Sequence, residues 1–212
     1  MPFDFFTLAD HLNQILTQSE ADLRLEQAVY GLDSKDEKDL QSLLSAGLKQ
    51  FYSVAREVHY PSSVGNKRTH RLRCDLVLLE KGIEIKLDSH EPTLFDNPNA
   101  QPPTHGVWLE VKVARQFCEG GVRHLGYGSQ WRDAVVEDIR KMSTEPKIKD
   151  AGLVLIVFTE NDQVLGDDLQ HFEDVLVRKE VLAGFRQVRS VKILDRIGHH
   201  FCSIAIWPTI QR

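Results

Sequence analysis

The strongest constraint on the fold is an unbroken apolar run in the last third of the chain. Residues 152–158 read Gly-Leu-Val-Leu-Ile-Val-Phe, without the alternation of polar and apolar residues that marks a half-solvated strand. A run of this kind is typical of a strand that is covered on both faces. It is much shorter than the roughly 18 apolar residues that a membrane span requires. We therefore predict a central strand in a layered α/β domain.

The remaining elements follow from the periodicity of the apolar residues. Steps of three and four residues predict amphipathic helices over 3–18, about 36–51, 129–142 and about 167–183. Strand patterns are found over 55–60, 72–79, 107–113, 190–195 and 201–207, and a short segment at 83–87 can return as a hairpin strand. This order predicts a mixed central sheet with helices on both faces. A chain of 212 residues without internal repeats is expected to form a single domain over 1–212.

The cysteines and the N-terminus bear on the compartment in which the protein works. Cys74, Cys118 and Cys202 are odd in number and widely spaced, with no Cys-x-x-Cys pair. Neither a disulfide framework nor a zinc site of ordinary spacing is therefore predicted. The first residues lack the basic-then-apolar order of a secretory signal. We expect a cytoplasmic protein with reduced thiols and no membrane partner.

The net charge of −5 hides an uneven distribution along the chain. Residues 159–174 carry six acidic residues and no Lys or Arg, which favours a solvated face or a protein contact. Residues 62–73 carry no acidic residue but four basic ones, Lys67, Arg68, Arg71 and Arg73. A local basic segment of this kind can contact phosphate groups, although an ordinary charged loop has the same composition. The net charge therefore does not exclude a nucleic-acid partner.

Two acidic residues and a lysine lie within the predicted strands. Asp75 interrupts the apolar strand 72–79, and Glu110 and Lys112 share one face of the strand 107–113 because side chains alternate along a strand. Carboxylate oxygens are the ligands that Mg²⁺ prefers. A nearby ammonium group can orient or help deprotonate an attacking water and stabilise charge on a phosphoryl group. In the alternative interpretation, Glu110 and Lys112 pair on a solvated face while Asp75 caps a turn.

The order of these residues resembles the core of the PD-(D/E)XK nucleases, the restriction-endonuclease-like superfamily. A helix, a strand, a strand with Asp75, a strand with Glu110-x-Lys112, a helix and a strand follow one another over about 36–158. The resemblance implies an αβββαβ core, a helical N-terminal extension over 1–35, and an added helix and β-hairpin over 159–212. It also implies that Asp75, Glu110 and Lys112 are catalytic and that the two carboxylates bind Mg²⁺ or Mn²⁺. Cys74 stands where many members have proline.

Two further acidic residues are candidates to complete the metal shell. Glu37 begins the stripe of the helix near residue 36, where family members often place an acid. The sequence Ser34-Lys35-Asp36-Glu37 is equally consistent with a capping box, in which Ser34 and Glu37 satisfy the first N–H groups of the helix. Glu57 lies next to Arg56 on the first predicted strand, and a solvated ion pair is the alternative role for this carboxylate. The choice between these roles stays open at this point.

A second Glu-x-Lys sequence, Glu84 and Lys86, competes for the role of the catalytic pair. We favour Glu110 and Lys112, because a glycine-rich turn and a helix follow them, whereas Lys86 runs into a proline-rich loop over 88–106. Gln130 lies in the first turn of that helix, where several relatives carry a polar residue near the scissile phosphate.

The resemblance implies a metal-dependent nuclease that hydrolyses phosphodiester bonds, with DNA as the favoured substrate and endonucleolytic cleavage as the favoured mode. The basic residues of 62–73 and Gln130 would contact the nucleic acid. Many relatives cut both strands as homodimers, so a homodimer is one expectation. The alternative is a non-catalytic module that keeps the nuclease fold and binds nucleic acid or a protein.

Overall fold

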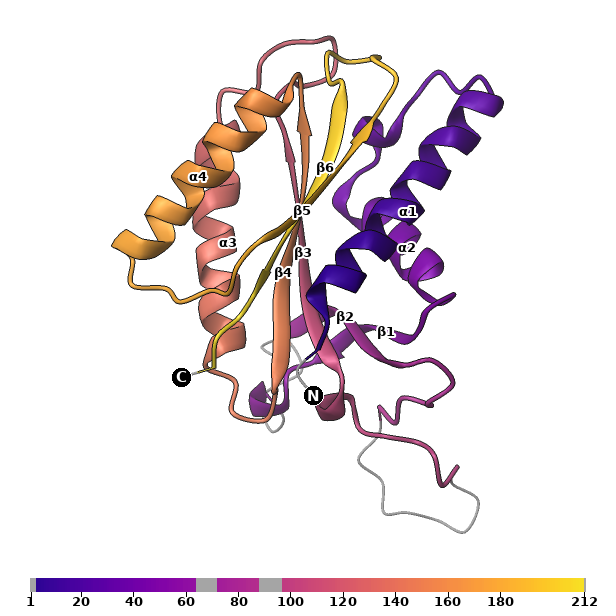
Figure 1. Cartoon of the computed structure of the whole chain (residues 1–212), viewed down its shortest axis with the longest axis vertical. Helices are drawn as coiled ribbons and strands as arrows, with labels where there is room; N and C mark the ends of the chain where they lie inside the picture. The colour runs from indigo at the N-terminus through magenta and orange to yellow at the C-terminus, as the bar shows by residue number, and fades with distance from the viewer. Residues whose placement is uncertain (1–2, 64–71, 88–96, 212) are drawn as a thin grey trace.

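The computed structural model describes residues 3–63, 72–87 and 97–211, and in these segments six strands form one mixed sheet packed against four α-helices (Figure 1). The helices are α1 (Phe5–Leu25), α2 (Glu37–Leu48), α3 (Tyr127–Ser143) and α4 (Asp162–Arg178). The strands are β1 (Tyr52–His59), β2 (Arg73–Glu80), β3 (Val107–Arg115), β4 (Asp150–Thr159), β5 (Gln187–Lys192) and β6 (Phe201–Pro208). None of the helices in the described part of the chain combines the length and the apolar composition needed to cross a bilayer.

The strand order is β1-β2-β3-β4-β6-β5. β3 and β4 run parallel, whereas every other neighbouring pair is antiparallel. The parallel pair is joined by α3, because parallel neighbours need a crossover connection. The sheet is therefore mixed, and the predicted α/β class with a mixed sheet and flanking helices is confirmed.

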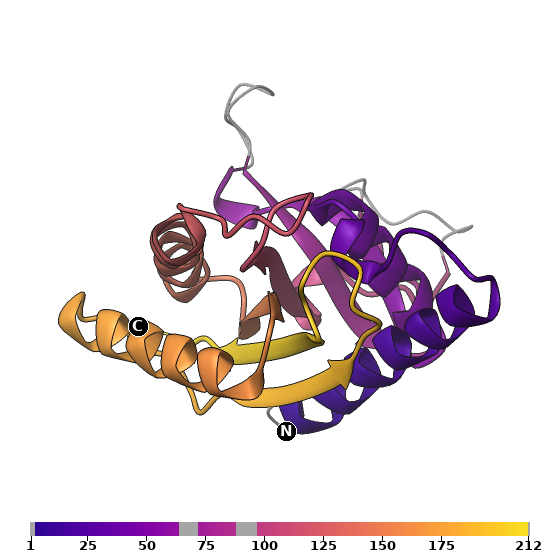
Figure 2. The same ribbon diagram turned by 90° about the horizontal axis from the view of Figure 1, so that it is seen from above.

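β4 lies inside the sheet and separates two apolar cores. All residues of this strand after Asp150 are buried, as the apolar run predicts. Leu153 and Leu155 face the core under α3 and α4, whereas Val154 and Ile156 face the core under α1 and α2. Figure 2 shows the two helical layers on opposite sides of the sheet. An uninterrupted apolar strand is required here because both of its faces are covered by helices.

Three local predictions are wrong. Residues 83–87 form no hairpin with β2, and their only described strand contact is an isolated parallel bridge between Ile85 and Gln101. α4 begins at Asp162 rather than near 167, because the side chain of Asn161 caps it by accepting a hydrogen bond from the backbone N–H of Val164. α1 continues to Leu25, seven residues further than predicted.

The cap of α2 also differs from the predicted capping box. Asp36 is the N-cap, and its Oδ1 accepts a hydrogen bond from the backbone N–H of Asp39 at 2.8 Å. Ser34 ends a short 3-10 turn, η1 (Leu32–Ser34), and makes no cap. The helix therefore begins two residues later than the box requires, with Glu37 at its first position, where its side chain is available for another contact.

Candidate active site

The candidate site forms where β2 and β3 separate. The two strands pair only over 76–78 and 107–109. The next position in the register would set Asp75 opposite Glu110, but no backbone pairing continues there. Instead, Oδ2 of Asp75 accepts a hydrogen bond from the backbone N–H of Val111 at 2.7 Å. The Asp75 carboxylate therefore takes the place of a backbone carbonyl of β2 as the hydrogen-bond acceptor. It lies beside Glu110, at the point where β2 and β3 diverge.

Glu110 points to the α3 side of the sheet and is almost completely buried, with 3% of its surface exposed. Its Oε1 accepts a hydrogen bond from the hydroxyl of Tyr60 at 2.7 Å and lies 2.6 Å from Nζ of Lys141. Tyr60 follows β1 and Lys141 lies on α3, so two elements converge on one carboxylate oxygen. The ammonium group of Lys141 also lies over the Tyr60 ring, 5.0 Å from its centroid. These contacts fix the orientation of the Glu110 side chain.

The two carboxyl groups influence each other. Burial raises the pKa of Glu110 to about 7; the attraction of Lys141 acts against this rise, and repulsion by Asp75 adds to it. Burial also raises the pKa of Asp75, although hydrogen bonds from Val111 and with Glu110 oppose that rise. The repulsion between the two carboxylates means that they lie close enough to interact electrostatically. One buried and one half-buried carboxylate so close together are unfavourable at neutral pH unless a positive charge compensates them.

Lys112 lies two residues beyond Glu110 on the same face of β3, as the alternation predicts. Its Nζ lies 3.4 Å from Oδ2 of Asp138 on α3 and 3.8 Å from Oε1 of Glu37 on α2. Burial acts to lower the pKa of Lys112, but the attraction of the surrounding carboxylates outweighs it, so that the pKa is raised. Lys112 is therefore an ammonium ion at neutral pH.

Three residues of this cluster are absent from the sequence predictions: Tyr60, Asp138 and Lys141. Asp138 connects the two lysines, because its Oδ1 lies 2.9 Å from Nζ of Lys141 and its Oδ2 faces Lys112. A signal for the α3 pair does exist in the sequence. Asp138 follows the apolar position Val135 by three residues and Lys141 follows Asp138 by three, so both lie along the stripe of α3 that faces the sheet. Nothing in the sequence indicates the contact of Tyr60 with Glu110.

The two candidates for a supplementary metal ligand lie elsewhere in the network. Glu37 approaches Lys112, and Glu57 approaches the guanidinium of Arg73 at 3.7 Å, with both partners about half exposed. The contact of Glu57 is the solvated ion pair that the sequence left as an alternative, although with Arg73 instead of Arg56. The described residues contain no group of three or more His, Cys, Asp or Glu side chains able to hold a metal ion. The arrangement therefore offers two carboxylates, from Asp75 and Glu110.

The other predicted contact residues are distributed as follows. Lys67, Arg68 and Arg71 lie outside the described residues. Gln130 belongs to the first turns of α3, where the structure describes the backbone alone. Glu84 accepts a hydrogen bond from Nδ2 of Asn97 at 3.0 Å on the connection after β2, beyond the opposite end of that strand from Asp75. The structure thus brings Asp75 together with Glu110 and Lys112.

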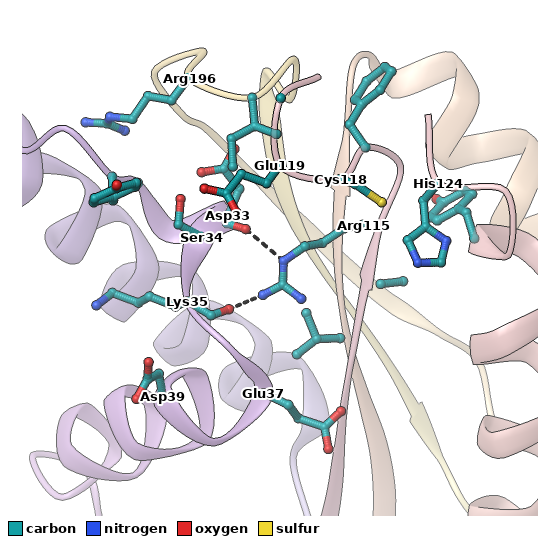
Figure 3. Close-up of a pocket in the computed structure, with 18 of the residues that line it drawn as sticks. Asp33, Ser34, Lys35, Glu37, Asp39, Arg115, Cys118, Glu119, His124 and Arg196 are labelled. Atoms are coloured by element: carbon teal, nitrogen blue, oxygen red, sulfur yellow. Dashed lines mark hydrogen bonds between the residues drawn. The ribbon is translucent and has the colours of Figure 1, made fainter. Parts of the chain in front are cut away.

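A cleft of about 1150 Å³ reaches the cluster at Lys112 and Glu37. Figure 3 shows one wall formed by the segment from Asp33 to Asp39 and the other by the glycine-rich segment with Cys118 and His124. Arg115 at the end of β3 crosses the floor of the cleft, and its guanidinium donates hydrogen bonds to the backbone carbonyls of Asp33, at 2.7 Å, and of Lys35. These hydrogen bonds therefore connect the sheet with the segment before α2 at the floor of the cleft.

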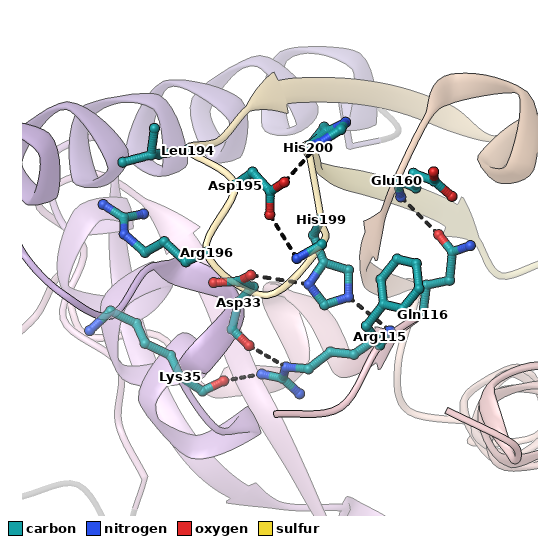
Figure 4. Close-up of polar contacts among 12 residues, drawn as sticks. Asp33, Lys35, Arg115, Gln116, Glu160, Leu194, Asp195, Arg196, His199 and His200 are labelled. Atoms are coloured by element: carbon teal, nitrogen blue, oxygen red, sulfur yellow. Dashed lines mark hydrogen bonds and ion pairs between the residues drawn. The ribbon is translucent and has the colours of Figure 1, made fainter. Parts of the chain in front are cut away.

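A buried Asp–His pair supports this end of the cleft (Figure 4). His199 and Asp33 are both fully buried, and Nδ1 of His199 lies 3.1 Å from Oδ2 of Asp33. Nε2 of the same ring accepts a hydrogen bond from the backbone N–H of Phe117 at 3.0 Å, so the ring carries its proton on Nδ1 and donates it to Asp33. His200 turns outward to Asp195, so the side chains of the two adjacent histidines diverge. His199 thus links three segments of the chain.

No family model, no curated protein and no solved structure matches this chain.

Proposed function

We propose that this protein is a metal-dependent nuclease of restriction-endonuclease-like architecture that hydrolyses phosphodiester bonds, with DNA as the favoured substrate and endonucleolytic cleavage as the favoured mode. The observation that carries the proposal is the meeting of the Asp75 and Glu110 carboxyl groups at the split between β2 and β3, with Lys112 on the same strand face as Glu110. This is the arrangement that the resemblance to PD-(D/E)XK nucleases requires.

The two carboxylates fit a hard divalent cation. One oxygen of each is already engaged: Oδ2 of Asp75 by Val111, and Oε1 of Glu110 by Tyr60 and Lys141. The other oxygens, Oδ1 of Asp75 and Oε2 of Glu110, are not the ones that Val111, Tyr60 and Lys141 contact. Mg²⁺ commonly takes one or two carboxylates and keeps several waters. Asp75 and Glu110 would therefore hold Mg²⁺ or Mn²⁺ through one oxygen each.

The roles of the side chains follow from their charges. When bound, the ion would lower the pKa of a water and polarise the phosphoryl group. Lys112 stays protonated, so it donates hydrogen bonds to the attacking water or to a phosphoryl oxygen and does not act as the base. Glu37 and Asp138 hold the ammonium group of Lys112 from two helices, which limits its motion. The substrate would reach Lys112 through the cleft between α2 and the glycine-rich segment.

A non-catalytic module is the second candidate function, and one observation favours it. Both lysines of the cluster are paired with carboxylates, Lys141 with Glu110 and Lys112 with Asp138. A network of this kind can be retained for structure alone. Such a module would bind nucleic acid or a protein without cleaving a phosphodiester bond.

Cleavage and binding assays separate the two functions. Supercoiled plasmid and single-stranded DNA are incubated in Mg²⁺ or Mn²⁺ with the wild type, Asp75→Asn and Lys112→Met. The matched control is Lys86→Met, the same substitution in the Glu84-x-Lys86 sequence. We expect the first two variants to lose about 10²–10³-fold in rate and the control to cleave like the wild type. Binding without cleavage in either metal would favour the module.

A further inference from the structure

We propose that the site takes a single divalent cation and that the ammonium group of Lys141 occupies the place of a second one. This inference rests on the proposed nuclease function and specifies its metal stoichiometry. Lys141 is then a positioning residue that supplies a fixed positive charge, in contrast to Lys112, which faces the cleft.

The contacts of Glu110 leave room for one metal ion on its carboxylate. In two-metal sites the ions lie about 3.5–4 Å apart and clamp the attacking and leaving oxygens. A carboxylate that bridges two such ions with both of its oxygens offers one oxygen to each of them. Oε1 of Glu110 already receives the Tyr60 hydroxyl at 2.7 Å and Nζ of Lys141 at 2.6 Å. A single oxygen, Oε2, is left for a metal ion.

The burial of Glu110 and Tyr60 leaves little space for a second hydrated ion at Oε1 of Glu110. Mg²⁺ demands near-octahedral geometry and gives up its waters reluctantly, so a second ion at Oε1 would need room for several waters. Glu110 is 3% exposed, and the Tyr60 ring at its Oε1 is buried against Trp108, with ring centroids 5.3 Å apart. Lys141 reaches the same oxygen along a hydrocarbon stem and places its charge there by a direct ion pair.

Asp138 restricts where the ammonium group of Lys141 can lie. Asp138 lies one turn before Lys141 on α3, and its Oδ1 is 2.9 Å from Nζ of Lys141. Its Oδ2 is 3.4 Å from Nζ of Lys112. The same carboxylate thus sets the spacing between the two ammonium groups. Lys141 is directed to the buried oxygen of Glu110, and Lys112 is directed toward α2 and the cleft. The charge that a second ion would supply is therefore built into α3.

Ion counting tests the inference. Mn²⁺ binding to the full-length protein is measured by electron paramagnetic resonance, with Asp75→Asn as the reference that defines the ions of the site. We expect one Mn²⁺ per chain in the wild type and none in Asp75→Asn. Two ions lost together in Asp75→Asn would overturn the inference while leaving the nuclease proposal intact. No ion at this site in the wild type would overturn both.

Substitution of Lys141 provides the complementary test. Lys141→Met keeps the length of the side chain but removes the charge, so oxygens of Glu110 and Asp138 become available and we expect a second Mn²⁺ to bind. Lys141→Arg restores a positive charge and should bind one ion, as should Lys179→Met, which removes an exposed lysine paired with Asp133. A count of one ion in a folded Lys141→Met variant would contradict the inference. If that variant does not fold, the counts for the wild type and Lys141→Arg still decide, because two ions in either would contradict it.

Discussion

The sequence Glu-x-Lys occurs three times in the chain, and two of these copies, at 84–86 and 110–112, lie in opposite environments. Glu110 is buried between β3 and α3 and contacts Tyr60 and Lys141, whereas Glu84 is exposed on the connection after β2 and contacts Asn97. The same residue types in the same spacing therefore have different surroundings. The chemistry of such a pair is set by the elements packed against it, and not by the spacing itself.

The largest difference between the two copies is expected in catalysis. Glu110→Gln keeps the size of the side chain and removes one ligand charge, so cleavage in Mg²⁺ should fall about 10²–10³-fold. Glu84→Gln makes the same change on the exposed copy and should stay within about twofold, as surface substitutions usually do. Initial rates on a labelled duplex measure both. Equal losses in the two variants would remove the distinction between the two copies.

The pH dependence of cleavage should also follow Glu110. The ionised carboxylate binds the cation, and its pKa is raised to about 7, so kcat/KM should rise with pH through this region and fall by up to about tenfold per pH unit below it. Because proton and cation compete for the same oxygen, more Mg²⁺ should move the midpoint to lower pH. A profile that is flat down to pH 5 at low Mg²⁺ would contradict this expectation.

Stability should respond to the same carboxyl group. The pKa of Glu110 in the folded protein, about 7, exceeds its ordinary value of 4.5, so the folded state binds more protons between these two values. The contribution of Glu110 to the free energy of unfolding is therefore greatest below pH 4.5 and is lost as the pH rises through 7. Urea unfolding at several pH values should show this loss in the metal-free wild type and in Glu84→Gln. Glu110→Gln should lack it, and an unchanged pH slope in that variant would contradict the assignment.

The smallest expected effect concerns a single hydroxyl group. Tyr60→Phe removes one of the two donors to Oε1 of Glu110 and should lower the free energy of unfolding by about 1–3 kcal/mol. The control, Tyr30→Phe, removes a hydroxyl from an exposed ring and should change it by less than about 0.5 kcal/mol. Urea titrations at one pH compare the free energies of unfolding of the two variants. Similar losses in both would mean that the buried hydrogen bond does not stabilise the folded protein.

Much of the fold could be predicted because it depends on local patterns. The apolar run of 152–158 predicts a strand covered on both faces, and β4 is such a strand. Alternation along 107–113 predicts that Glu110 and Lys112 share a face, and the adjacent Leu109 and Val111 do pack into the opposite core. Periodicity reports the face of an element on which a residue lies, which is sufficient to assign layers.

The rest depends on contacts between distant parts of the chain. The end of the β2–β3 pairing, which lets the Asp75 carboxylate accept from Val111, is a matter of register that a strand pattern does not specify. The contact of Tyr60 with Glu110 joins residues 50 positions apart. The cap of α2 is decided by competition between two nearby capping residues, Ser34 and Asp36. Ser34 belongs to the 3-10 turn, so Asp36 caps the helix.

The most direct test of the central claim is the rate of phosphodiester hydrolysis by the wild type and Asp75→Asn, measured side by side in Mg²⁺ and in excess EDTA. Asp75 is the reference because its carboxylate occupies the split between β2 and β3. The proposed nuclease function predicts that the wild type hydrolyses the substrate in Mg²⁺, that EDTA abolishes this hydrolysis, and that the substitution slows it about 10²–10³-fold. Hydrolysis at the same rate in EDTA or by Asp75→Asn, or none by the wild type in any divalent cation, would contradict it.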